Sequence, residues 1–554
     1  MLCVESDLKF KRWRALCANI RNLGLVIFLG FTFPLIAQDI PDRSAATADL
    51  IFTGLQEFEL MGNSMDVGFD LDRDGLEDFA IGAPAGGKRC FENPPVPFKF
   101  CDGAVFLFGG KRANLIKRLE GPINQNPDST NNFGSAVRLA DLNGDGLAEV
   151  IVGSSYSDAR GYHSGNVNVY SGTDYKILSQ FYCDSKVSDE CGRSIATGCD
   201  LDSDGSSEIL VGAHTGVYIY SGRSSAFLGK ISSVQGSADD WAKNIRCDGD
   251  FTGDGKSDVL VAAPLEDVNG SGSGAVYGYD GNDFQNRILL RGDVAGDQFG
   301  RGLSFVGDVN RDGFDDFAVG ADQQSDRGYV RLYSGRDLSI LSEWKSYENC
   351  GSTGANCNFG ASLSSAGDQN GNGIADLLIS DPTYNAGQGR LYLVSLADSQ
   401  FIQTITGESP SSDAFSVPCR GLSSNFDANG DGQSDILCAA PFHDSGGTDT
   451  GRAYLFLSYV PEQAPPPASD DEDLRICLDD LSTSREELVS LQAQVLLLQD
   501  QNSEQANHIV EYQARIIRLE RKIEQILSQL KNPEGNGSKF GKSIWSKLFD
   551  LIYF

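Results

Sequence analysis

Basic residues are scarce in this chain of 554 residues, which has 45 lysines and arginines against 77 aspartates and glutamates, a formal net charge of −32. A nucleic-acid-binding surface needs clustered positive charge, so this balance argues against a nucleic-acid partner. Metal cations are the favoured partners of so acidic a chain, and a merely solubilising acidic surface is the alternative. The positions of the carboxylates decide between these two interpretations.

A hydrophobic run long enough to cross a bilayer is also missing. The apolar stretch at residues 23–36 has about 14 residues, fewer than the ~20 that a spanning helix needs. It follows a basic segment with Lys9, Lys11, Arg12, Arg14 and Arg21. Residues 1–38 therefore read as a signal peptide, with a retained signal anchor as the alternative. Both predict export, as a secreted, extracellular or cell-envelope protein in the periplasm or at the cell surface.

Histidine is rare, and no catalytic motif accompanies it. The four histidines, His163, His214, His443 and His508, are dispersed along the chain. Neither a nucleophile elbow nor a zinc-ligand spacing surrounds any of them. The sequence therefore predicts no catalytic residues and no enzyme.

What the chain does have is one acidic loop, repeated seven times with the pattern D-x-[D/N/T]-x-[D/N]-G-x-x-[D/E]. The copies begin at Asp70, Asp141, Asp200, Asp250, Asp308, Asp368 and Asp427, at a spacing of 50 to 71 residues. Each copy follows a segment such as FGSAV at 133 and precedes an apolar run such as FAIGAP at 79. Such periodicity is the signature of a repeat architecture.

The loops place hard oxygen ligands at alternate positions, as calcium prefers. Glycine at the sixth position permits the tight turn. We expect up to seven Ca²⁺ ions, held at the first, third, fifth and ninth positions. These candidate ligands are Asp70, Asp72, Asp74, Asp78, Asp141, Asn143, Asp145, Glu149, Asp200, Asp202, Asp204, Glu208, Asp250, Thr252, Asp254, Asp258, Asp308, Asn310, Asp312, Asp316, Asp368, Asn370, Asn372, Asp376, Asp427, Asn429, Asp431 and Asp435.

The seven loops are graded in their acidity. The loops at Asp70 and Asp200 offer four acids, whereas the loop at Asp368 offers only two and is expected to bind most weakly. The alternative for any single loop is an ordinary turn, because Asp, Asn and Gly favour turns without a metal. Seven copies in register favour calcium.

Every repeat also contains further strand-like segments. A third strand follows each loop, for example GAVFLFGG at 103, and a weaker fourth segment follows it, such as residues 401–405. Seven units of four strands predict an all-β, seven-bladed propeller over residues 47–460. The seventh unit stops after its third strand, so residues 49–54 are expected to supply its fourth strand and close the ring.

The FG segment, the acidic loop and the GAP segment resemble the FG-GAP repeats of integrin α-subunit propellers and related bacterial proteins. The resemblance covers about residues 47–460 and implies adhesion, with the calcium loops on one face. It further implies that the loops joining the second and third strands lie on the opposite face. The candidate ligand-binding residues there are Phe91, Phe98, Phe100, Tyr156, Tyr162, Tyr384 and Phe442. Ordinary packing of these aromatic residues is the alternative.

Eleven cysteines follow the signal segment, a number that suits disulfides in an oxidising compartment. Three close pairs are Cys90 with Cys101, Cys183 with Cys191, and Cys350 with Cys357. By elimination, Cys199 can pair with Cys247 and Cys419 with Cys438, which leaves Cys477 over. Sequence alone does not establish the connectivity.

The C-terminal part differs in character from the repeats. A Pro-rich acidic linker at 461–473 precedes about eight heptads at 474–531, which predict an α-helical coiled coil. Asn502 at an a position favours a parallel homodimer, with a trimer as the alternative. In the homodimer, two copies of Cys477 can form an interchain disulfide, and a free, inert thiol is the alternative. The apolar tail at 532–554 is expected to form an interfacial membrane helix or to pack on its neighbour.

The leading functional hypothesis is a multivalent binding or adhesion module for a protein or glycan. The alternatives are a propeller-based hydrolase acting on a glycan or phosphoester, and a purely structural envelope component.

Overall fold

The computed structural model describes residues 43–458, apart from 55–58, 87–89, 93–98, 111–113, 123–129, 185–187, 235–239, 323–327, 347–357, 409–421 and 445–448. The predicted signal segment, linker, coiled coil and tail lie outside the described residues. Within the described part, no helix combines the length and apolarity needed to cross a membrane.

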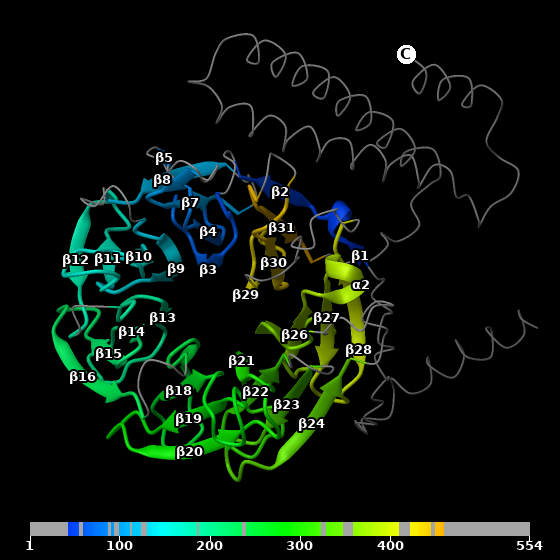
Figure 1. Ribbon diagram of the computed structural model, residues 1–554. Coiled ribbons are helices and arrows are strands. Elements are labelled where there is room, and N and C mark those ends of the chain that lie inside the picture. Colours follow the sequence, from blue (N-terminus) through cyan, green and yellow to red (C-terminus); the bar gives the residue numbers. More distant parts are fainter. Residues whose placement is uncertain are drawn as a thin grey trace, which may run out of the picture. The chain divides into compact units, whose positions relative to one another are not determined.

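Seven antiparallel sheets form a ring, in chain order (Figure 1). The first blade consists of β3 (Ser64–Phe69), β4 (Asp78–Ala83), β7 (Ala104–Phe108) and β8 (Leu115–Glu120). The second consists of β9 (Phe133–Ala140), β10 (Glu149–Ser154), β11 (Asn166–Tyr170) and β12 (Ile177–Phe181). The third consists of β13 (Ser194–Ala196), β14 (Ile209–Ala213), β15 (Gly216–Tyr220) and β16 (Phe227–Ser232). The fourth and fifth are β17 (Ile245–Gly249), β18 (Asp258–Ala263), β19 (Ala275–Tyr279) and β20 (Asn286–Arg291); and β21 (Phe299–Gly307), β22 (Asp316–Ala321), β23 (Tyr329–Tyr333) and β24 (Ile340–Lys345). The sixth is β25 (Leu363–Gly367), β26 (Asp376–Asp381), β27 (Arg390–Ser395) and β28 (Phe401–Thr406), and the seventh contains β29 (Leu422–Phe426), β30 (Asp435–Ala440) and β31 (Arg452–Phe456).

The N-terminal segment closes the ring, as the sequence predicts. β2 (Leu50–Thr53) pairs antiparallel with β31 and completes the seventh blade. The structure adds a second contact, because β1 (Arg43–Ser44) pairs in parallel with β28 and gives the sixth blade a fifth strand. The short 3₁₀ helix η1 (Ala45–Thr47) links β1 to β2, so this segment joins two adjacent blades. A helix α2 (Tyr384–Gly387) and a hairpin of β5 (Cys90–Glu92) and β6 (Lys99–Cys101) decorate the loops.

The hydrophobic core is divided into seven clusters, one between each pair of neighbouring blades. The second strand of each blade is buried along its whole length, for example in β4 and β10. Both of its faces meet neighbouring blades, so it reads as a continuous apolar run. The fourth strand is partly exposed, as in β12. The FAIGAP-like runs are therefore explained by face-to-face packing of blades.

The recurrent Phe-Gly pair lies where two neighbouring blades are in close contact. Phe133 is fully buried, and Gly134 has φ +90°. A Cβ on Gly134 would lie 2.7 Å from the main-chain oxygen of Ala104 in the preceding blade. Only glycine tolerates both this backbone conformation and this approach. The recurrent Phe-Gly pair thus supplies a core side chain and then a close passage of the backbone.

Two predicted disulfides are confirmed, Cys183–Cys191 and Cys199–Cys247. Cys90 and Cys101 are register partners in the β5–β6 hairpin, consistent with their predicted pairing. The predicted bond between Cys419 and Cys438 is wrong, because Cys438 is a buried free thiol that packs in the core between the sixth and seventh blades. Cys350, Cys357, Cys419 and Cys477 lie outside the described residues.

Candidate functional site

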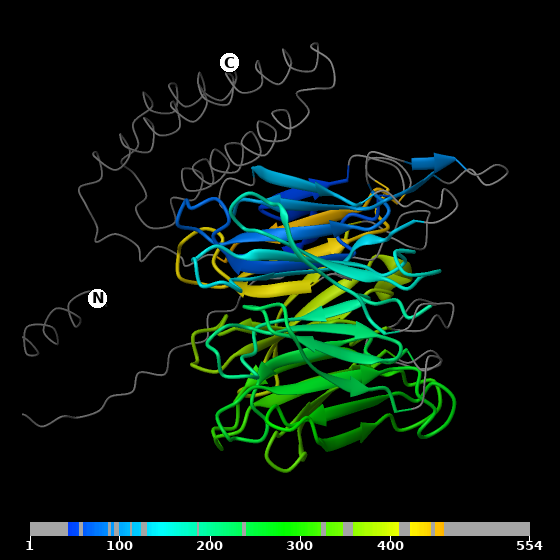
Figure 2. The same ribbon diagram turned by 90° about the vertical axis from the view of Figure 1, so that its left-hand side faces the viewer.

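The acidic loops connect the first strand of each blade to the second. The first, second and third strands of each blade pair antiparallel, so these loops emerge at one end of the blades. The loops that join second and third strands emerge at the other end. Figure 2 shows the blades from the side, with loops at both ends. The structure thus separates two loop faces, as the family resemblance implies.

The first-position carboxylate organises each acidic loop. In the first loop, Asp70 accepts hydrogen bonds from the main-chain N–H of Asp74 at 3.1 Å and of Gly75 at 2.8 Å. The bond to the glycine recurs in all seven loops, at 2.6 to 3.0 Å. The glycine itself has φ between +79° and +89° in every copy. This left-handed conformation explains the glycine at the sixth position.

The ninth-position acid lies beneath the loop, fully buried. Asp78 accepts hydrogen bonds from the N–H of Leu71 at 2.7 Å and of Gly110 at 2.8 Å, which ties the loop to the end of the third strand. Burial raises the pKa of Asp78 to about 7, and burial likewise raises that of Glu208 to about 7. The nearby loop acids contribute in the same direction. Each such cluster therefore holds negative charge that a cation would stabilise.

Two loops bring their carboxylates closest together. Oxygen atoms of Asp200, Asp202, Asp204 and Glu208 all lie within 4.8 Å of one another, as do those of Asp70, Asp72 and Asp78. These are the two loops with four acids. Clustered carboxylate oxygens are hard ligands of the kind that Ca²⁺ takes. The residues present therefore fit a divalent cation.

In the second, fourth and sixth loops, the third residue is neutral and donates a hydrogen bond to an acid of the same loop. In the second loop, Asn143 donates its amide N–H to Glu149 at 2.8 Å, and Asn370 does the same to Asp376 at 3.1 Å in the sixth. In the fourth loop, the hydroxyl of Thr252 donates to Asp250 at 3.2 Å. These side chains relieve repulsion between carboxylates by donating hydrogen bonds. The loops with fewer acids therefore contain a donor side chain where the first and third loops have a carboxylate.

The opposite face carries a stack of three aromatic side chains. His163 lies between Tyr156 and Tyr162, with ring centroids 4.6 and 3.9 Å away and interplanar angles of 13° and 17°. Both tyrosines were predicted to lie on this face, and their exposed fractions are 37% and 59%. We call Tyr156, Tyr162 and His163 the aromatic platform. Sequence analysis missed His163, since a dispersed histidine carries no pattern of its own.

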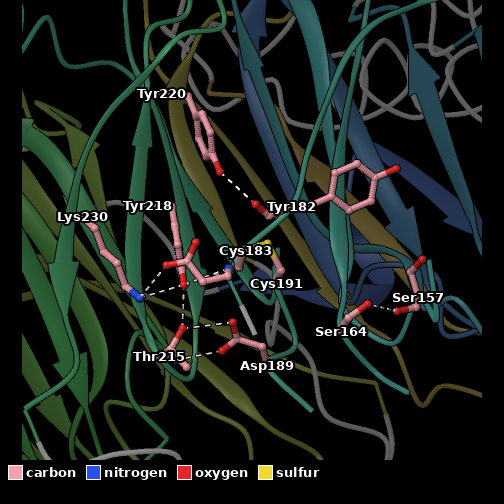
Figure 3. Close-up of a disulfide and its surroundings, with 11 residues drawn as sticks. Ser157, Ser164, Tyr182, Cys183, Asp189, Cys191, Thr215, Tyr218, Tyr220 and Lys230 are labelled. Carbon is pink, nitrogen blue, oxygen red and sulfur yellow. Dashed lines mark hydrogen bonds and ion pairs between the residues drawn. A yellow bond between two sulfur atoms is a disulfide. The ribbon is translucent and has the colours of Figure 1, made fainter. Parts of the chain in front are cut away.

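The aromatic platform rests on a neighbouring loop that a disulfide closes. The N–H of Ser188 donates to the carbonyl of Tyr162 at 2.8 Å, and that of Glu190 to the carbonyl of His163 at 3.1 Å. The Cys183–Cys191 disulfide spans this second loop (Figure 3). Asp189 in the same loop accepts hydrogen bonds from the N–H and hydroxyl of Thr215 in the third blade. Two blades therefore fix the position of the aromatic platform.

The other candidate ligand-binding residues are either less exposed or not among the residues and side chains that the structure describes. The guanidinium carbon of Arg390 lies 3.7 Å from the ring centroid of Tyr384, and Phe442 is half-buried. Phe98 lies outside the described residues, and the side chains of Phe91 and Phe100 are not described. The structure thus brings together Tyr156 and Tyr162 but not the whole predicted set.

The three described histidines take part in contact networks. Besides His163 in the aromatic platform, His214 contacts Arg193 and Glu190, and His443 lies 3.5 Å from Glu408. The hydrogen bond from His443 and the nearby Arg452 lower the pKa of Glu408 to about 2. Such ion-pair networks stabilise loops and give these histidines a role in structure.

Comparison with known proteins supports the repeat interpretation. The family model described as FG-GAP repeat matches residues 61–94, 133–170, 249–279, 299–333 and 425–456. Integrin alpha-5 of Xenopus laevis is 30% identical over 166 residues, which cover 28% of this chain and 14% of that protein. Integrin alpha-6 of Homo sapiens is 32% identical over 148 residues, covering 26% and 12%.

A relative of another kind matches as well. The phosphatidylinositol-glycan-specific phospholipase D of Bos taurus is 28% identical over 126 residues, covering 23% of this chain and 14% of that protein. A solved structure of BBS1N in complex with ARL6DN has a TM-score of 0.46 at 9% identity and covers 76% of this chain and 99% of its own. The chain spans less than one sixth of the length of the curated relatives named here. With FG-GAP repeats in five of its seven four-stranded blades and integrin α-subunits among its relatives, the described part of the chain is an integrin-α-like FG-GAP β-propeller.

Proposed function

We propose that this chain is an exported, calcium-binding propeller that acts as a binding or adhesion module for a protein or glycan ligand. The acidic loops stabilise one face, and the opposite face presents the binding surface. The observation that carries the proposal is the aromatic platform, in which exposed tyrosines stack on His163 rather than pack into a core. Integrin relatives support a role in binding, and the site supports it independently.

Calcium is the proposed cation for the acidic loops. Each loop presents carboxylate, amide or hydroxyl oxygens at alternate positions around a tight turn, and the ninth-position acid anchors that turn to the blade. Calcium tolerates such flexible, oxygen-rich coordination better than magnesium, which demands near-octahedral geometry. We infer a structural role, since these loops join strands one and two in every blade and lie away from the aromatic platform.

The aromatic platform suits ligand binding because it is preorganised. Large exposed aromatic side chains provide contact area at low entropic cost when their rotamers are already fixed. Tyr162 is the most exposed of the three, and Tyr156 also lines the mouth of the central channel. A sugar ring or an apolar protein side chain can stack on these faces.

Export and multivalency complete the proposal. The two described disulfides fit an oxidising, extracellular compartment. The heptads at 474–531 would join two propellers in a parallel homodimer and raise avidity for a repetitive surface. The tail at 532–554 would add a peripheral membrane contact. These three features are proposed from the sequence.

The test is a binding screen of the full chain against glycans and surface proteins, in calcium and in chelator. We expect a ligand that binds in calcium and is lost with Tyr162→Ala. The matched control is Phe227→Ala, since Phe227 is 57% exposed but lies on an outer strand. A ligand whose binding both variants leave unchanged would contradict the proposed surface. Hydrolysis of a glycan or phosphoester by the purified protein, lost on replacing His214 or His443, would instead support an enzyme.

A further inference from the structure

The central channel of the ring differs in charge from the rest of the molecule. The first strand of each blade contacts the first strands of its neighbours around the whole ring. Residues on the first strands of the first six blades, with residues of the adjoining loops, line a cavity of about 670 Å³. Five of the nine charged side chains that line it are basic, in a chain where acids outnumber bases 77 to 45. The basic residues are Arg138, Arg193, Lys243, Arg246 and Arg301.

Three of the five basic residues have carboxylate partners. Arg193 forms a salt bridge with Asp240, and Lys243 lies 3.8 Å from the same residue. Arg301 pairs with Asp322 at 3.3 Å. The positive charges of these three side chains are therefore offset within the protein.

Arg138 on β9 and Arg246 on β17 are different. Arg138 donates to the carbonyl of Val137 at 2.8 Å, and the Nε of Arg246 donates to the carbonyl of Leu303 at 3.0 Å. Among the described residues, neither guanidinium forms a salt bridge, and the remaining N–H groups of each have no protein acceptor. Main-chain carbonyls thus hold both groups in place while leaving donors free in a polar cavity.

Asp66 is a carboxylate close to both arginines, and it already accepts a main-chain hydrogen bond. Asp66 interacts electrostatically with both arginines, but its Oδ2 accepts the N–H of Leu139 at 2.7 Å. Burial raises the pKa of Asp66, despite the opposing charge of Arg138. Burial and the neighbouring Arg138 lower the pKa of Arg246, outweighing Asp66 and Asp248. Among the described residues, neither Asp66 nor Asp248 forms a salt bridge with Arg138 or Arg246, so both guanidiniums keep N–H donors for a further acceptor.

We propose that Arg138 and Arg246 form a binding site for an oxyanion, a carboxylate or a tetrahedral sulfate or phosphate group, inside the central channel. The planar guanidinium presents parallel N–H donors that match two oxygens of such a group. An anion placed between the two arginines would receive charge-assisted hydrogen bonds from two blades and would cancel their mutual repulsion. The two arginines belong neither to the acidic loops nor to the aromatic platform, although Tyr156 lines the same cavity.

The test is titration calorimetry of the full chain in saturating calcium, at constant ionic strength maintained with chloride. Sulfate represents a free dianion, and N-acetylaspartate amide represents the acidic side chain of a partner. Saturable binding of either probe is expected, and the probe that binds more tightly identifies the source. Arg138→Gln or Arg246→Gln should weaken it about tenfold, which corresponds to one charge-assisted bidentate contact. Absence of saturable binding for both probes would refute the proposal.

The matched control is Lys243→Gln, which removes the same charge from the same channel at a residue that has a partner. Its affinity for the probe should change less than twofold. Equal weakening by all three variants would show only a general field effect and would overturn the site. In case an arginine variant fails to fold, protection of Arg138 and Arg246 from phenylglyoxal by sulfate can be measured in the unaltered protein. The exposed Arg223 should remain unprotected, and equal labelling with and without sulfate would also refute the proposal.

Discussion

The side-chain carboxylate of Glu77 accepts a hydrogen bond at 2.7 Å from the main-chain N–H of Asp427, 350 residues away, and so joins the first acidic loop to the seventh. The same relation recurs between the fourth and fifth loops, where Asp315 accepts the N–H of Asp250 at 2.8 Å. In both cases the eighth residue of one loop meets the first residue of the loop before it. In these two pairs, the acidic loops are therefore coupled to each other as well as anchored to their own blades.

Replacing Glu77 should weaken the closure of the ring. Glu77→Ala removes the acceptor of a half-buried main-chain N–H, at an expected loss of about 1–2 kcal/mol in the free energy of unfolding. Glu77→Gln retains an acceptor oxygen and should lose less than half of that. Urea denaturation in saturating calcium measures both. Equal stability of Glu77→Ala and the unaltered protein would contradict the coupling.

Removing calcium should lower the stability of the propeller. A cation that binds only the folded chain adds about 2.7 kcal/mol for each site when its concentration is a hundred times the dissociation constant. The melting temperature should therefore rise with calcium concentration and fall in chelator. Magnesium at the same concentration is the control and should stabilise less. Identical melting curves in calcium and in chelator would refute metal binding.

The seven loops should bind unequally. Asp200→Asn alters the four-acid cluster of the third loop and should reduce the calcium bound at limiting concentration by about one ion per chain. Asp368→Asn makes the matched change in the two-acid sixth loop, which is expected to be largely empty under these conditions. Calcium titration calorimetry compares the two variants. A larger loss for Asp368→Asn would contradict the grading.

The fold could be predicted from the sequence because the turn residues and the strand pattern of each repeat indicate the same four-stranded unit. The loop glycines, the buried second strands and the closing strand at 50–53 all follow from periodicity and turn chemistry. The parallel pairing of β1 with β28 could not be predicted, because two residues carry no detectable period. The channel arginines are likewise invisible as a site, since Arg138 and Arg246 are 108 residues apart and only the folded ring places both along one cavity. The Cys419–Cys438 prediction was wrong because elimination ignores burial, and Cys438 packs in a core.

Loss of the two described disulfides should have different consequences. Cys199–Cys247 spans 48 residues and joins the third and fourth blades, whereas Cys183–Cys191 spans 8 residues. Loop-closure entropy predicts losses of about 4 and about 2–3 kcal/mol for the respective double serine variants. Only the variant at 183 and 191 should also weaken ligand binding, because that loop supports the aromatic platform. Denaturation of both variants, together with the ligand screen, separates stability from binding.

Asp381 on β26 should make the stability depend on pH. Burial raises its pKa from 3.8 to about 6, although hydrogen bonds from Thr383 oppose the shift, and one of its oxygens has no partner among the described residues. A folded-state pKa above the unfolded value means that the protonated form stabilises the fold. This contribution is fully present below about pH 4 and is lost as the pH rises through 6.

Asp381→Asn keeps the shape of the side chain without its charge. Relative to the unaltered protein, it should therefore gain about 2–3 kcal/mol between pH 4 and pH 7. Urea denaturation across this range in saturating calcium measures the difference. Asp267→Asn is the control, since Asp267 is exposed, and it should show no such gain. A difference between Asp381→Asn and the unaltered protein that stays constant with pH would mean that Asp381 remains ionised in the folded state, with a partner that compensates its burial.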